Sequence, residues 1–144
     1  MAKVDLDREL AVTQRRRKEL GISLRLDHAL RVMAHEAKSV SAWLEEPSGT
    51  EQRTVSPSTW KLSTEPDLNE AWMSLEIFPR KTAKQFNLLR ACLYNFENFR
   101  SRHSGPLVVK AGDGEILKND RETIQEIAST AERLLNDLRE FQNR

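Results

Sequence analysis

The sequence predicts an all-α protein: an up-down bundle of four main helices plus a short one, with a small β-hairpin or irregular insertion near residues 105–118. Two observations support this. Gly and Pro number only five each in 144 residues, which is poor in turns for an all-β chain. Several stretches also repeat apolar residues at the helical period. The length predicts a single domain over residues 1–144, able to bury a core without disulfides or metal.

The first helix is predicted over residues 5–20. Leu6, Leu10, Thr13 and Arg17 lie along one side of it, so its apolar stripe is thin.

A second and longer helix is predicted over residues 23–46. Gly21 is expected to end the first helix, and Ser23 could cap the second. The turn residues 47–49 would end it. Its apolar residues follow the 4-3-4-3-4 spacing of a helix in a bundle or coiled coil. They are Leu26, Leu30, Met33, Ala37, Val40 and Leu44.

Residues 47–66 form a polar loop that is long for a compact domain. Either it is a mobile or functional loop, or residues 54–63 form a short strand or irregular flap. Trp60 is its only aromatic residue. If exposed, Trp60 is a candidate anchor for a protein partner. Alternatively, it folds back onto the bundle.

The remaining helices are predicted over residues 67–78, 80–103 and 120–143. The last has the clearest apolar stripe, made of Ile124, Ile127, Ala131, Leu134, Leu138 and Phe141. Between the last two helices, apolar runs at 107–109 and 115–117 flank Gly-Asp-Gly. A β-branched run on either side of Asp-Gly predicts a hairpin.

Charge is balanced in total but segregated along the chain. The net charge is +1, from 23 basic and 22 acidic residues, which excludes a uniformly basic nucleic-acid coat. Residues 1–38 carry +3, 45–76 carry −5, 79–103 carry +5 and 113–143 carry −4. Complementary helices in a bundle would explain the alternation.

Basic residues at the two ends of the helix over 80–103 could instead bind a phosphate backbone. The block at residues 15–18 could join one of those ends. The candidate nucleic-acid-binding residues are Arg80, Lys81, Lys84, Arg100, Arg102, Arg15, Arg16, Arg17 and Lys18.

The chain offers few residues for redox or metal chemistry. Cys92 is the only cysteine, which excludes an internal disulfide and favours a buried thiol in a cytoplasmic protein. His28 and His35 are seven residues apart, about 10 Å along a helix and too far for shared metal binding. No apolar run is long enough to span a membrane. We therefore expect no cofactor, no metal and no membrane association.

His103 ends a predicted long helix in the run from Asn98 to Gly105, before a loop and a final amphipathic helix. This arrangement resembles the HEPN-like helical domains, over about residues 86–143. The resemblance implies a helical bundle, often dimeric, whose catalytic members cut RNA with an Arg and a His near a helix end. The positions five and six residues before the His hold Asn98 and Glu97 in place of that Arg, as expected of a degenerate, non-catalytic relative. Arg100 and Arg102 would be the accompanying cations.

The sequence thus predicts a non-enzymatic helical interaction module or a small subunit of a larger assembly, with a protein partner or self-association. One alternative is a HEPN-like RNA-binding or RNA-cleaving protein of a toxin or defence system. If the protein is an enzyme, it is a ribonuclease with His103 as the candidate catalytic residue. The other alternative is a DNA-binding regulator.

Overall fold

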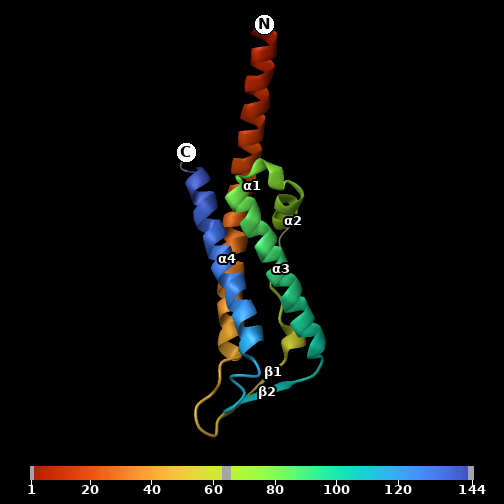
Figure 1. The fold of residues 1–144 in the computed structure, drawn as a ribbon, viewed down its shortest axis with the longest axis vertical. Coiled ribbons are helices and arrows are strands. Elements are labelled where there is room, and N and C mark those ends of the chain that lie inside the picture. Colours follow the sequence, from red (N-terminus) through yellow and green to blue (C-terminus); the bar gives the residue numbers. More distant parts are fainter. Residues whose placement is uncertain (1, 63–65, 143–144) are drawn as a thin grey trace.

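Helices dominate the computed structural model, which describes residues 2–62 and 66–142 (Figure 1). The long helices are α1 (Ala2–Trp43), α3 (Arg80–Arg102) and α4 (Lys118–Gln142), and α2 (Pro66–Met73) is short. Single 3-10 turns lie at Pro57–Thr59 and Leu75–Ile77. The prediction of a mainly helical protein is confirmed. None of the helices in the described ranges is both long and apolar enough to cross a membrane.

The predicted helix break at Gly21 is wrong. The two predicted helices at 5–20 and 23–46 belong to α1, so the long helices number three rather than four in the described part of the chain. A glycine that ends a helix usually adopts a positive φ, and Gly21 does not. The next residue, Ile22, is fully buried, and packing from there on outweighs the roughly 1 kcal/mol that glycine costs inside a helix. Ser23 is therefore no cap but a buried residue within the helix.

Both α1 and α3 pack against α4 (Figure 1). The figure shows that α1 and α3 run in the same direction and α4 in the opposite one. The chain returns between α1 and α3 mainly as a non-helical segment, so these two successive long helices do not alternate in direction as the predicted up-down order requires. The predicted stripe of α4 is confirmed at its five positions from Ile124 to Leu138, each at most 1% exposed.

One cluster of buried side chains joins the three long helices to α2 and to the segment before it. Trp72 of α2 anchors that helix on α3, since its indole Nε1 donates a hydrogen bond to the Phe86 carbonyl oxygen at 2.9 Å. The guanidinium of Arg90 lies 5.7 Å from the centre of the same indole ring, within the range of a cation–π contact.

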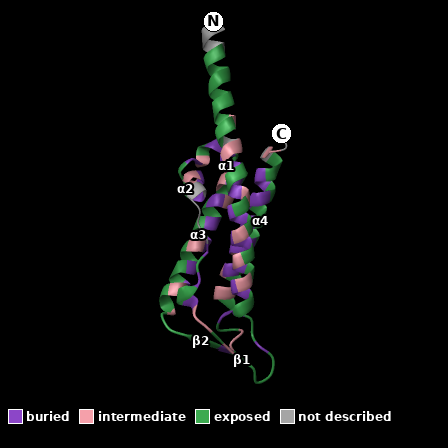
Figure 2. Cartoon of the chain, turned by 180° about the vertical axis from the view of Figure 1, so that it is seen from behind, coloured by how far each residue is buried: buried purple, intermediate pink, exposed green. Residues whose placement is uncertain are grey.

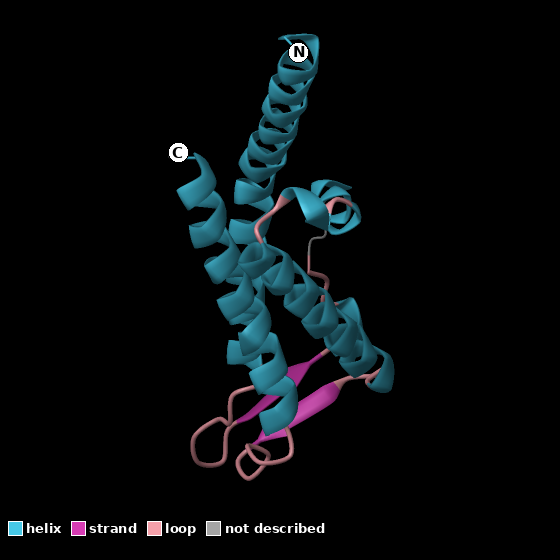
Figure 3. Cartoon of the chain, turned by 45° about the horizontal axis from the view of Figure 1, so that its top comes forward, coloured by secondary structure: helices cyan, strands magenta, loops and turns pink. Residues whose placement is uncertain are grey.

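A two-stranded antiparallel sheet lies below the ends of the helices (Figure 3). Strand β1 (Gln52–Val55) pairs with β2 (Leu107–Lys110), with Arg53 opposite Val109. The predicted hairpin at 105–118 is therefore wrong in its second half, because β2 takes its partner from the long polar loop. Residues 115–117 instead turn into α4, since the Leu117 N–H already donates to the Asp113 carbonyl. Their Ile116 is 76% exposed, so it lacks the packing that holds Val109 in the core.

Candidate functional site

The residues that carry the HEPN-like resemblance lie at the C-terminal end of α3, where His103 and Arg100 are engaged in packing. His103 follows the last turn of the helix, and its ring centre lies 4.8 Å from that of Phe99. Arg100 is mostly buried, pairs with Glu97 at 2.6 Å and donates to the Ser58 carbonyl oxygen at 3.0 Å. That last bond ties the returning segment to α3. The geometry thus gives Arg100 a structural role.

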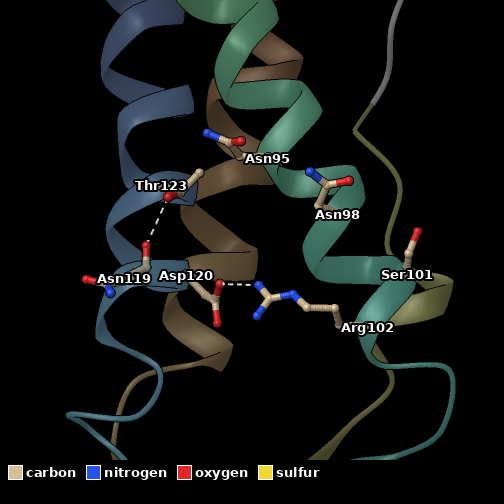
Figure 4. A pocket seen from close by; sticks show the side chains of 7 residues that line it. All are labelled: Asn95, Asn98, Ser101, Arg102, Asn119, Asp120 and Thr123. Carbon is tan, nitrogen blue, oxygen red and sulfur yellow. Dashed lines mark hydrogen bonds and ion pairs between the residues drawn. The ribbon is translucent and has the colours of Figure 1, made fainter.

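Arg102, in contrast, points into an open polar groove of about 620 Å³, which lies between the C-terminal end of α3 and the N-terminal end of α4 (Figure 4). Its guanidinium pairs with the Asp120 carboxylate at 2.8 Å, which neutralises the cation. The other lining residues are amides and hydroxyls, namely Asn95, Asn98, Ser101, Asn119 and Thr123. This lining can exchange hydrogen bonds with a polar ligand, but it offers neither a net charge nor a nucleophile paired with a base.

The candidate nucleic-acid-binding residues do not form one patch. The two ends of α3 are separated by the length of a 23-residue helix, about 33 Å, so Arg80, Lys81 and Lys84 lie far from Arg102. Lys81 pairs at 3.2 Å with the largely buried carboxylate of Asp137.

The basic block of α1 joins the N-terminal end of α3, as the sequence allowed. Arg15 donates a hydrogen bond to the Glu76 carbonyl oxygen, in the turn that precedes α3. In the described part of the chain, four cations of this end, Arg17, Lys18, Arg80 and Lys84, form no ion pair.

Trp60 is not an exposed anchor, so that reading of the sequence is wrong. It is only 8% exposed and lies between the rings of Trp43 and Phe99, with centroid distances of 5.5 and 6.3 Å. The reading in which Trp60 folds back onto the helices is confirmed. Trp43 is instead the exposed tryptophan of this cluster, at 44%.

The remaining candidates for chemistry are isolated. His28 and His35 are exposed on α1, and the described residues contain no group of three side chains placed to hold a metal ion. Cys92 is buried, and its pKa is raised above the ordinary value of 9.0, first by burial and then by the nearby Glu126 carboxylate. A raised pKa keeps the thiol protonated and unreactive.

The N-terminal part of α1 extends well beyond the other elements (Figure 1), and its residues 6–18 are exposed apart from the intermediate Arg16 (Figure 2). We call residues 6–18 the projecting segment. It carries three large apolar residues with at least half of their surface exposed: Leu6 at 55%, Leu10 at 51% and Val12 at 67%. Its length of thirteen residues corresponds to about 20 Å. Apart from contacts at its basic end, such as that of Arg15 with Glu76, most of this segment is exposed, and its apolar side chains belong to no core cluster among the described residues.

No family model, no curated protein and no solved structure matches this chain.

Proposed function

We propose that the protein is a helical interaction module that binds a protein partner through the projecting segment of α1. The observation behind this proposal is the exposure of Leu6 and Leu10 on a helix that stands clear of its own fold. Both leucines of the α4 stripe are covered, whereas Leu6 and Leu10 are not. Apolar residues gathered on an accessible helix favour docking to another protein.

The helical state of the segment also favours this function. An isolated helix of this length is marginal in water, but here the packed part of α1 supplies the nucleus and the segment only extends it. A partner therefore meets a pre-formed helix and need not order it, which lowers the entropic cost of binding.

Site-specific photo-crosslinking in cells that express the protein tests this proposal. A photoreactive amino acid at Leu10 should give discrete protein adducts. The same probe at Ile116, which is 76% exposed in a loop at the far end, is the matched control and should give few. Equal labelling from both positions, or none from Leu10, would contradict the proposed function.

Nucleic-acid binding is the second candidate, favoured by Lys18, Arg80 and Lys84, three of the described cations without an ion pair near the point where α1 meets the start of α3. Binding to these residues should weaken steeply with salt, and Arg80→Ala with Lys84→Ala should flatten that dependence. The HEPN-like alternative adds a further expectation, loss of RNA cleavage in His103→Ala. An absence of RNA and DNA binding at low salt rejects all of these nucleic-acid functions.

A further inference from the structure

The projecting segment has a face that matches the seam of a coiled coil. Leu6, Leu10, Thr13 and Arg17 follow a 4-3-4 spacing, and all four side chains are exposed. Arg15, which contacts the turn before α3, is two residues from both Thr13 and Arg17 and therefore points to the opposite side of the helix. The seam face is thus directed away from the chain's own fold.

Charges along the segment are divided between its two halves. The acidic residues Asp7 and Glu9 lie in the first half, and the basic block 15–18 occupies the end of the second. Arg8, the one basic residue of the first half, is two residues from both Leu6 and Leu10 and so lies on the side opposite the seam. Beside the seam, each segment therefore has an acidic and a basic end.

We propose that the partner of this segment is a second copy of the same chain, paired with it in antiparallel orientation. This inference rests on the proposed function of the segment. Centred between Ala11 and Val12, the pairing sets Leu10 against Thr13 of the second copy and Leu6 against the aliphatic stem of its Arg17. The acidic half of each copy then meets the basic half of the other. A parallel pair would instead place basic block on basic block.

The interface is small, because each copy contributes only two leucines to the seam. Such an interface is typical of a weak and reversible dimer, not an obligate one. Part of its stability comes from exposed ion pairs, which salt screens. The dimer should therefore form with rising protein concentration in the micromolar range and weaken as salt is added.

Charge exchange between two variants gives the sharpest test, with sedimentation velocity as the readout. Asp7→Lys with Glu9→Lys makes the seam flanks basic, and Arg17→Glu with Lys18→Glu adds acid to the basic end. The first variant should be monomeric alone, whereas an equimolar mixture of the two should form a heterodimer. These side chains lie outside the core, so both variants should keep the wild-type circular dichroism spectrum. Glu115→Lys with Glu122→Lys, an equal charge change at two exposed positions elsewhere, should dimerise like the wild type.

Disulfide trapping tests whether the two projecting segments pair in antiparallel or parallel orientation. In a Cys92→Ala background, mixing Leu10→Cys with Thr13→Cys should give a disulfide between the two variants. Efficient crosslinking of Leu10→Cys to itself would indicate a parallel pair and overturn the proposal.

The two proposals can fail separately. If the wild type stays monomeric at every concentration, the second copy is excluded as the partner. Photo-crosslinks from Leu10 to a different protein would then still support the interaction module. If Leu10 also gives no adducts, the proposed function fails as well.

Discussion

Arg53 Nη1 lies 2.9 Å from the carbonyl oxygen of Trp43, the last residue of α1. The same nitrogen donates to the Glu45 carbonyl at 3.0 Å. The last carbonyls of a helix have no partner within the helix and carry partial negative charge, so a guanidinium there satisfies and stabilises them. Because Arg53 belongs to β1, this contact joins the sheet to the end of the longest helix.

We expect Arg53→Ala to lower the free energy of unfolding by about 1–2 kcal/mol, because it removes charge-assisted hydrogen bonds. Arg53→Lys should keep part of that stability, and Gln52→Ala, at the exposed neighbouring position, should have little effect. Chemical denaturation measures all three. A stability of Arg53→Ala equal to that of Gln52→Ala would show that the capping contact is not formed in solution.

Trp43 and Trp60, whose rings are in contact, should differ in their contribution to stability. Trp60→Ala should lower the free energy of unfolding by about 3–5 kcal/mol, because it empties a buried site between Trp43 and Phe99. Trp43→Ala should have a clearly smaller effect, since much of that ring is already in water. Thermal unfolding of the two variants gives the comparison, and the reverse order would contradict the burial of Trp60.

Gly112 has a φ of +96°, a conformation that side-chain-bearing residues rarely adopt. Gly112→Ala should therefore destabilise the turn after β2, by about 1 kcal/mol or more. Gly105→Ala is the matched control, because that glycine has no positive φ and open space around its Cα. Equal unfolding midpoints for the two variants would argue against the positive φ of Gly112.

Stability should fall with rising pH at the alkaline end because of Cys92. Its thiol has a raised pKa in the folded protein and an ordinary one, near 9.0, when unfolded. The unfolded chain therefore binds fewer protons above that pH, so the contribution is complete below the unfolded pKa and is lost as the pH rises toward the folded pKa. Cys92→Ala should reduce this alkaline fall in the unfolding free energy. An unchanged pH profile would place its cause elsewhere.

Packing patterns were predictable from the sequence where local propensity and the tertiary fold agree. The apolar period of α4 predicted five of its buried side chains, from Ile124 to Leu138, and the predicted helix over 80–103 matches α3 within one residue. Gly21 misled the prediction because packing at Ile22 overrides a local helix breaker. The hairpin failed for a similar reason: β-branched runs predict strands but not their partners, and the partner of β2 lies more than fifty residues earlier in the sequence.

Only part of the candidate site could be predicted from the sequence. Leu6 and Leu10 could be read as a thin stripe, but their exposure depends on where the neighbouring elements end. The capping role of Arg53 and the polar groove beside Arg102 had no signal in the sequence, since both arise from residues that only the fold brings together. Arg102 looked like a phosphate ligand until the structure placed Asp120 beside it.

Because α1 continues through Gly21, the rotation of the projecting segment about the helix axis is fixed relative to the rest of the fold. Each residue of a helix advances its surface by about 100° and about 1.5 Å, so a rigid connection sets both the direction and the reach of the docking face. Inserting one alanine after Lys18 would turn that face a quarter of the way around the axis, whereas inserting seven would nearly restore it. The projecting segment therefore has a set length and a set rotation, so a partner bound as proposed would be oriented by it as well as held.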